Sequence, residues 1–503
     1  MTMNTTELIY PFDSTRLPRP ILDSHQDFVA LYDFAWELGA CNTRKSRGRW
    51  HLDTSWGSGN EGGWNYQWVW DTALMTLWAR YSGGTLPAME SFDNFYELQR
   101  DDGFISMTYD FDTDQEPYPG RINPPLFAWA EWEYYVTTGD ASRFERVVPH
   151  IERLMDWIEK NRTNYAKGTD NSDVNEDSVE PLYWFADGGS SGMDDSPRTP
   201  RNPDAGRHYH WIDLSSQMVL SFDCLVKIHR VLGNSQQAAN WEEKGARKAA
   251  RINECMWSEK THFYHDLALP GRFVSTKTVA AFWPILAGIC TGDRLASLMT
   301  HLLDEREFNR PIPVPGLSAD DPNYREGGNY YCGGVWAPTN YMITRGLQLV
   351  GEGNLAHEIA MKYLGGMARI WRNFEPHTLW EGYAPEFDAP ARRPYNEELC
   401  KPDFVGWSGI GPITMLIENV IGLNICAPER KVTWDIRLTE KHGIQDLGIS
   451  EGNVDLLCAA RSGPDVPAKV EISTDIPYTI VLRRGSIEKS ITTTPGKVEI
   501  IVV

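Results

Sequence analysis

Residues 124–161 read PPLFAWAEWEYYVTTGDASRFERVVPHIERLMDWIEKN, and the fold can be worked out from this stretch. Apolar residues recur every three or four positions on both sides of Thr138-Gly139-Asp140, which is the spacing of an amphipathic helix. Pro124-Pro125 suits the first turn of one helix, the glycine suits its end, and the aspartate suits the start of a second helix. The stretch therefore predicts two helices joined by a tight turn.

The same apolar spacing recurs over most of the chain. It predicts twelve helices, at residues 24–40, 70–83, 88–100, 124–138, 143–161, 211–232, 235–257, 278–290, 292–303, 336–350, 354–374 and 408–422. Twelve helices in antiparallel pairs, with long loops at one end, predict a mainly α protein built as an (α/α)6 barrel, or toroid. An open α-solenoid has similar periodicity and stays an alternative.

The pattern changes after about residue 428. Short alternating runs separated by turn residues follow, at Val432–Leu438, Lys469–Ile472, Tyr478–Leu482 and Val498–Val502, and these are typical of β-strands. The sequence thus predicts two domains: an (α/α)6 catalytic barrel over 1–427 and a small C-terminal β-sandwich over 428–503.

The composition limits the partners. The 503 residues carry 48 Lys and Arg against 69 Asp and Glu, a net charge of −21 that disfavours nucleic acid and anionic membranes as partners. No apolar run approaches the roughly 20 residues of a membrane span. Met1–Thr5 shows no basic segment followed by an apolar run, and the eight cysteines are scattered. We therefore expect a cytoplasmic protein without a secretory signal.

No motif in the sequence indicates a metal or cofactor. There is no CxxC pair, P-loop, GxSxG or HExxH, and the twelve histidines lack the spacing of metal ligands. By contrast, 20 Trp and 21 Tyr offer flat faces that suit pyranose rings, although a large aromatic core is the alternative for most of them. We expect a sugar ligand, with no metal and no cofactor.

Two carboxylates in the long loops are candidate catalytic groups. Asp194 follows Gly192-Met193 in the loop 162–210, and Glu381 lies between an aromatic residue and a glycine in the loop 375–407. Catalysis would need one carboxyl group held near apolar rings, so that its pKa rises. An exposed acidic turn and a helix-capping glutamate are the respective alternatives.

Six motifs together resemble the inverting glycosidases of families 37 and 63, which include trehalases, processing α-glucosidases and mannosylglycerate hydrolases. In chain order they are Gln67-Trp68-Val69-Trp70-Asp71, Arg121-Ile122-Asn123-Pro124-Pro125, Ser191-Gly192-Met193-Asp194, Val335-Trp336-Ala337-Pro338, Trp380-Glu381-Gly382-Tyr383 and Phe404-Val405-Gly406-Trp407-Ser408. Ser-Gly-Met-Asp replaces the Ser-Gly-Trp-Asp of trehalases, and the trehalase Arg-Pro-Glu element has no clear counterpart. The resemblance is therefore closer to family 63.

The resemblance implies an (α/α)6 barrel and an inverting, exo-acting α-glycosidase that removes a terminal α-glucosyl or α-mannosyl residue from a small glycoside or oligosaccharide. It implies Asp194 as general acid and Glu381 as general base, a pair that flanks the scissile bond and leaves room for a water. The substrate-binding residues that it implies are Trp70, Asp71, Arg121, Asn123, Gly192, Trp336, Glu398 and Trp407.

Two other functions stay open. A phosphorylase or lyase on the same toroid would not use Glu381 to activate water, and a non-catalytic carbohydrate-binding protein would need neither carboxylate. The sequence leaves the sugar, the leaving group and the oligomeric state undecided.

Overall fold

A computed structural model of the chain describes residues 12–53, 66–164, 180–200, 205–269, 271–394 and 397–503. The expectation about the secretory signal concerns residues 1–5, which lie outside this part. Among the described residues, no helix combines the length and the apolar character that a bilayer crossing requires.

Ten of the twelve predicted segments form α-helices. They are α1 (Gln26–Cys41), α2 (Val69–Ala79), α3 (Ala88–Glu97), α4 (Phe127–Thr138), α5 (Phe144–Asn161), α7 (Ile212–Val231), α8 (Ser235–Cys255), α10 (Gly292–Leu303), α11 (Ala337–Leu349) and α12 (Gly353–Asn373). The prediction of a mainly helical protein is confirmed.

The two remaining segments are helical in a different way. Residues 278–290 form a 3₁₀ turn, η4 (Val279–Phe282), and then a single α-helical turn, α9 (Trp283–Leu286). Residues 408–422 form a 3₁₀ turn, η5 (Ser408–Ile410), followed by the π-helix η6 (Gly411–Ile421).

For the pair of helices at 124–161, one local prediction is confirmed and another is wrong. α4 ends at Gly139, whose φ of 79° is a left-handed conformation that glycine adopts at low cost. Asp140 does not cap α5, contrary to the prediction. Its side chain instead accepts a hydrogen bond from the Ser142 N–H at 2.9 Å, and α5 begins at Phe144.

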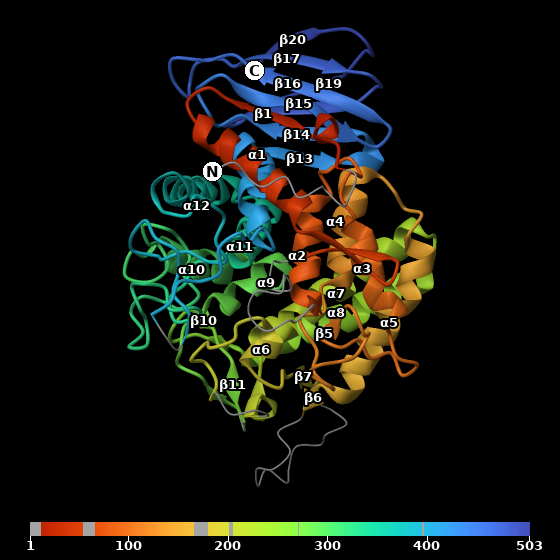
Figure 1. The fold of residues 1–503 in the computed structure, drawn as a ribbon, viewed down its shortest axis with the longest axis vertical. Coiled ribbons are helices and arrows are strands. Elements are labelled where there is room, and N and C mark those ends of the chain that lie inside the picture. The colour runs from red at the N-terminus through yellow and green to blue at the C-terminus, as the bar shows by residue number, and fades with distance from the viewer. Residues whose placement is uncertain (1–11, 54–65, 165–179, 201–204, 270, 395–396) are drawn as a thin grey trace.

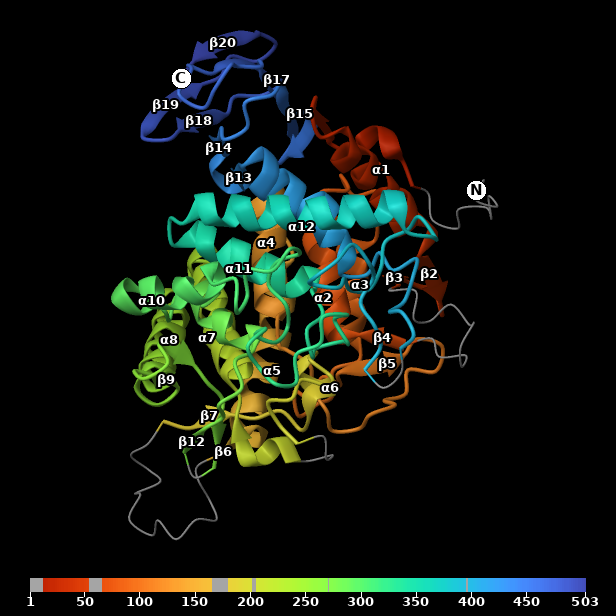
Figure 2. The same cartoon turned by 90° about the vertical axis from the view of Figure 1, so that its left-hand side faces the viewer.

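The helices divide into buried and half-exposed ones. Every residue of α2 and of η6 is buried, whereas α8 buries only four of its 21 residues. α2 packs against α4, α4 against α7, α7 against α9 and α9 against α11, while η5 and η6 contact both α11 and α2. α1, α3, α8 and α12 pack outside these helices, and Figure 2 shows α12 lying along α11.

Strands from both ends of the chain form two sheets beside the helices (Figure 1). One has the order β1 (Arg19–Leu22), β15 (His442–Ile449), β16 (Gly452–Cys458), β17 (Lys469–Thr474) and β20 (Glu499–Val502), with neighbours antiparallel. The other has the order β13 (Leu423–Cys426), β14 (Lys431–Asp435), β18 (Thr479–Arg484) and β19 (Ile487–Thr492), with β14 and β18 parallel.

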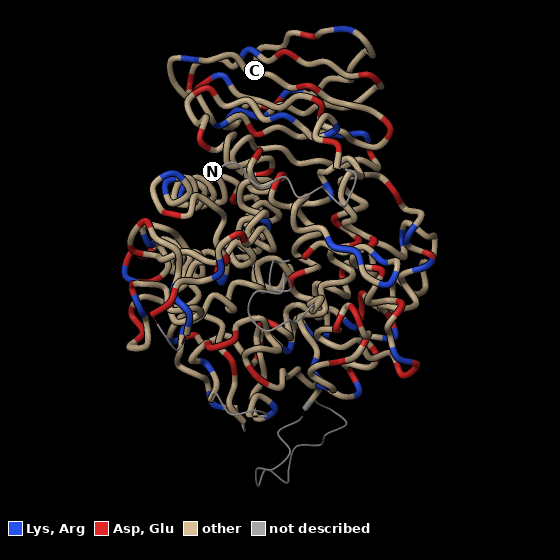
Figure 3. The backbone as a smooth tube through the Cα atoms, viewed as in Figure 1, with Lys and Arg blue, Asp and Glu red and all other residues tan. Residues whose placement is uncertain are grey.

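The C-terminal sheet region is thus present, as predicted. The division at residues 427 and 428 stays a prediction, but β1 and β13 lie before it in the chain and extend the two sheets. Figure 3 shows acidic and basic residues interspersed around the periphery of the molecule.

A buried ion-pair network joins four of the central elements. Arg80, which caps the C-terminus of α2, donates to Glu133 on α4 at 3.0 Å and also pairs with Glu418 on η6. Arg345 on α11 donates to both oxygens of Glu133 at 3.1 Å, and the Tyr341 hydroxyl donates to Glu418 at 3.0 Å. Burial opposes ionisation of Glu133, but the two arginines outweigh it and lower the pKa of this carboxyl group.

We expect Glu133→Gln to lower the free energy of unfolding by about 3 kcal/mol, because it leaves two buried guanidinium groups without their shared anion. Urea unfolding followed by tryptophan fluorescence measures this. Glu243→Gln on α8 is the matched control, since its ion pair with Arg247 at 2.7 Å is exposed and should contribute less than about 1 kcal/mol. Equal losses in the two variants would contradict a structural role for the network.

Candidate active site

The residues that line one pocket include several that lie just before, or in the first turn of, the central helices. Trp70 and Asp71 are in the first turn of α2, Arg121 and Asn123 precede α4, and Trp407 precedes η5. The other lining residues are Tyr66, Trp68, Met107, Tyr118, Gly189, Gly192, Asp194, Tyr330 and Tyr331. The volume of this pocket is about 310 Å³.

The loop that carries Asp194 is shaped by glycines. The short helix α6 (Gly188–Ser191) is capped by Asp187, which accepts a hydrogen bond from the Ser190 N–H at 2.9 Å. It ends at Gly192, whose φ of 73° is left-handed and where a Cβ would lie 3.0 Å from the Trp70 ring. A Cβ on Gly188 would lie 2.4 Å from the Asp194 carbonyl oxygen. Both positions therefore require glycine.

Asp194 is exposed and is one of the residues that line the pocket. The protein atoms around it displace part of the water that would otherwise solvate its carboxyl group. This loss of solvation raises the pKa of Asp194 to about 7, and the negative charges of Glu381, Asp195 and Asp187 act in the same direction. Asp194 can therefore hold a proton near neutral pH.

Glu381 has a different environment. It is buried, with 1% of its surface exposed, and burial raises its pKa. Hydrogen bonds to the charged form oppose that rise: the Tyr330 hydroxyl donates to Oε1 at 2.6 Å, and the Lys401 N–H donates to Oε2 at 3.1 Å. Trp407 Nε1 donates to the Glu381 carbonyl at 2.8 Å and so ties the backbone to the pocket wall.

Tyr330 and Tyr331 line the pocket, and the sequence analysis missed both. Tyr330 has a φ of 49°, a left-handed conformation that is uncommon for a bulky residue. The Tyr331 ring stacks on Trp336 at 4.7 Å with an interplanar angle of 14°. The available signal was the run Gly327-Gly328-Asn329-Tyr330-Tyr331-Cys332-Gly333-Gly334, in which two aromatic residues stand between glycine pairs inside a long loop.

Several residues that the sequence predicted for the site lie together. Trp70, Asp71, Arg121, Asn123, Gly192, Asp194 and Trp407 all line the pocket, although they are far apart in the chain. Burial raises the pKa of Asp71 well above its usual range, with the charges of Glu381 and Asp194 adding to the effect. Arg121 pairs with Asp187 at 2.8 Å, and Asn123 donates to the Ser190 carbonyl at 3.1 Å.

Three predicted residues lie behind or outside the pocket lining. Trp336 is fully buried behind Tyr331, and Glu381 lies behind the Tyr330 hydroxyl. The Glu398 side chain is 66% exposed and pairs with Arg393 at 3.8 Å, so the structure does not bring it to the described pocket wall.

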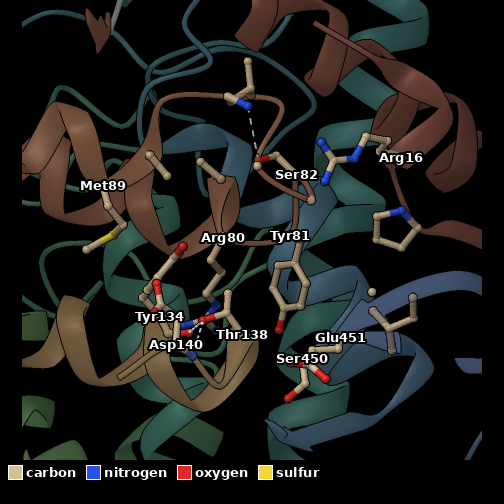
Figure 4. A pocket seen from close by; sticks show the side chains of 18 of the residues that line it. Arg16, Arg80, Tyr81, Ser82, Met89, Tyr134, Thr138, Asp140, Ser450 and Glu451 are labelled. Atoms are coloured by element: carbon tan, nitrogen blue, oxygen red, sulfur yellow. Dashed lines mark hydrogen bonds between the residues drawn. The ribbon is translucent and has the colours of Figure 1, made fainter. Parts of the chain in front are cut away.

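A larger groove of about 940 Å³ lies between the helices and the sheet region (Figure 4). Its walls include Arg80, Asp140, Arg143 and Glu451, but none of the residues predicted for the site. Arg80 is already paired in the buried network, and Arg143 is paired with Asp93 at 2.6 Å. We therefore take the smaller pocket as the candidate active site. The pKa values of its carboxyl groups, Asp71 and Asp194, are raised by burial and by neighbouring negative charges, and such perturbed groups are typical of functional sites.

The described residues contain no group of three or more His, Cys, Asp or Glu side chains arranged to hold a metal ion.

Comparison with known proteins identifies relatives of the chain. The family model for the mannosylglycerate hydrolase MGH1-like glycoside hydrolase domain matches residues 64–397. An uncharacterised protein of Borreliella burgdorferi is 28% identical over 441 residues, which are 86% of this chain and 88% of that protein. A probable mannosyl-oligosaccharide glucosidase of Schizosaccharomyces pombe is 26% identical over 251 residues, 47% of this chain but only 29% of that protein.

One solved structure has the same fold. The GH63 mannosylglycerate hydrolase of Thermus thermophilus, in complex with glucose, superposes with a TM-score of 0.60 at 19% identity. The superposition covers 76% of this chain and all of that chain.

Proposed function

Because the chain belongs to the MGH1-like mannosylglycerate hydrolase family of glycoside hydrolases, we propose that it is an inverting, exo-acting α-glycosidase with Asp194 as general acid and Glu381 as general base. The observation that carries this proposal is the contrast between the two carboxyl groups. Asp194 has a pKa of about 7 in the pocket, while Glu381 accepts two hydrogen bonds that favour its charged form.

The proposed reaction has one step. Asp194 gives its proton to the glycosidic oxygen as the bond from that oxygen to C1 breaks. A water attacks C1 from the opposite face, and Glu381 takes the proton that this water loses. Each oxygen of Glu381 has a second lone pair for this contact. The products are the aglycone alcohol and a sugar with inverted anomeric configuration.

The pocket supports a small, largely uncharged substrate. Its volume of about 310 Å³ is at the lower end for ligand sites. Among the described lining residues Arg121 is the one cation, and it is paired with Asp187. Tyr66, Trp68 and Tyr118 add aromatic surface that suits a sugar ring. We propose a terminal α-glucosyl or α-mannosyl residue on a small glycoside, in line with the glucosidase and mannosylglycerate hydrolase among the relatives.

We further propose that the helices close into an (α/α)6 toroid with the pocket at one end. The support is the cycle of contacts from α2 through α4, α7, α9 and α11 to η5 and η6 and back to α2, together with the placement of lining residues before these helices. A cytoplasmic location stays a prediction from the sequence.

The test is an NMR time course on a panel of small α-glucosides and α-mannosides, including the glycerate glycosides. We expect cleavage with the β-anomer released first. Prompt release of the α-anomer would mean retention and would overturn the two roles. No cleavage of any member would count against the proposed substrate class.

The pH profile of kcat/KM offers a second check. Asp194 must be protonated to act, and its pKa is raised to about 7, so activity should fall as pH rises through about 7. Glu381 must be ionised, and its pKa is raised above its ordinary value, so activity should also fall as pH drops toward that raised value. Initial rates over about pH 4 to 9 measure both limbs. Undiminished activity well above pH 7 would contradict the role of Asp194.

A further inference from the structure

Asp195 follows the proposed acid but has a different environment. Only 1% of its surface is exposed, and it is not among the described residues that line the pocket. Its Oδ1 accepts a hydrogen bond from the Tyr331 N–H at 2.8 Å, across 136 residues of sequence. A hydrogen bond between a carboxylate and a backbone N–H is charge-assisted and stronger than a neutral one. Asp195 therefore connects the Asp194 loop to the segment that carries Tyr331.

That segment reaches the other proposed catalytic group. The Tyr330 hydroxyl donates a hydrogen bond to Glu381 Oε1 at 2.6 Å, and the Tyr331 ring stacks on Trp336. One chain of contacts thus runs from Asp194 through Asp195, Tyr331 and Tyr330 to Glu381.

The backbone conformation at Tyr330 is one that needs contacts from its surroundings to stabilise it. Its φ of 49° is a left-handed conformation, which is unfavourable for a non-glycine residue and persists only where surrounding contacts enforce it. Tyr330 N–H donates to the Arg392 carbonyl at 2.8 Å, and its carbonyl accepts from the Gly334 N–H at 2.6 Å. The Asp195 side chain supplies a hold on the other side of the dipeptide, and this contact comes from the acid loop. The Asp195 carbonyl also accepts a longer contact from Cys332 Sγ at 3.7 Å, which the side-chain variants leave in place.

We propose that Asp195 is a positioning residue, which fixes the Tyr330–Tyr331 segment to the acid loop and so sets the placement of Glu381 relative to Asp194. This inference rests on the proposed function for the roles of Asp194 and Glu381, and the contact itself is independent of it. An inverting enzyme needs its two carboxyl groups at a separation that admits one water, so a device that couples their loops acts directly on the rate.

Asp195 also contributes charge to the site. The titratable groups that interact with the charge of Asp194 are Glu381, Asp195, Asp187, Asp71, Tyr330 and Tyr331. The negative charge of Asp195 raises the pKa of Asp194, so removing this charge should lower that pKa. The high-pH limb of the activity profile should then move to lower pH. This readout separates Asp195 from a residue that only stabilises the fold.

The experiment compares Asp195→Asn and Asp195→Ala with Ser196→Ala. Asparagine keeps an oxygen that can accept from Tyr331 N–H but removes the charge, whereas alanine removes both. Ser196→Ala deletes a buried hydroxyl oxygen from the same turn, and within the described part of the chain this oxygen makes no hydrogen bond to the Tyr330–Tyr331 segment, so the variant controls for damage to the turn. Each variant is assayed for kcat, KM and pH profile, and its crystal structure is solved.

For Asp195→Ala we expect kcat to fall about 100-fold with KM changed by less than about threefold, because geometry in the transition state is lost while binding is kept. Its crystal structure should show Tyr331 displaced from the acid loop and the Tyr330–Glu381 contact lengthened. Asp195→Asn should lose less than about tenfold in kcat and show the shifted limb. Ser196→Ala should resemble the wild type.

An Asp195→Ala variant with an unmoved Tyr331 and the kcat of Ser196→Ala would overturn the inference. If that variant does not fold, Asp195→Asn decides, and a pH limb and kcat equal to those of Ser196→Ala would overturn it. If the wild type cleaves no glycoside, the proposed function fails separately, and the position of Tyr331 in the variant crystals still decides this inference.

Discussion

Asp194→Asn is expected to lower kcat/KM for an α-glycoside with an alkyl or sugar leaving group by about 1,000-fold. The amide has the shape of the carboxyl group but has no acidic proton to give to the departing oxygen. The pocket should keep its form, because the glycines at 188 and 192 and the Asp187 cap set the backbone of the loop. Michaelis–Menten kinetics on the purified variant measures the loss.

Comparing substrates with different leaving groups tests specifically whether Asp194 acts as a general acid. A dinitrophenyl glycoside departs as a stable anion without protonation, so Asp194→Asn should lose far less activity on it than on the alkyl glycoside. Asp140→Asn, the same substitution in the larger groove, is the control and should change neither rate. An Asp194→Asn enzyme that keeps more than about a tenth of the wild-type rate on the alkyl glycoside would remove Asp194 from the role of acid.

The parts of the fold that were predictable are those set by local sequence. Each of the twelve segments predicted from apolar spacing contains a helix, whereas the short helix α6 was not predicted. Gly139 marked the end of α4 because a residue tolerant of positive φ is favoured there. The π-helical form of η6 was not predicted, since its apolar pattern is also compatible with an α-helix. The pairing of β1 with β15 joins residues at opposite ends of the chain, and no local pattern indicates such a pairing.

In the candidate site, too, the residues that depend on contacts between distant segments could not be predicted from local sequence. Asp194 and Glu381 could be proposed because each stands in a short motif with aromatic or glycine neighbours. Tyr330 and Tyr331 also stand between glycine pairs, but their importance depends on contacts with Asp195 and Glu381, which come from other loops and which the sequence does not show. Glu398 was predicted because it precedes Trp407 at the position where the trehalases that the chain resembles have a substrate-binding Glu. Such a position within a loop does not determine which side of the loop faces the pocket.

Glu381→Gln is expected to lower kcat/KM by about 1,000-fold or more, for a different reason. The amide cannot accept a proton from the attacking water, and a better leaving group does not replace that step. The loss should therefore be similar for the dinitrophenyl and the alkyl glycoside, unlike the loss in Asp194→Asn. Kinetics with both substrates measures this, and unchanged binding of a sugar product by calorimetry shows that the pocket is intact.

Glu398→Gln is the matched control on the same loop, because its side chain is exposed and paired with Arg393. We expect it to stay within about threefold of the wild type. A large loss there would instead return Glu398 to the substrate-binding set that the sequence predicted. If Glu381→Gln behaved like Asp194→Asn, with its loss relieved by the better leaving group, Glu381 would be assisting departure of the aglycone. The base would then have to be another group, and Asp71 is the candidate, because it is buried and is the carboxylate besides Asp194 among the described lining residues.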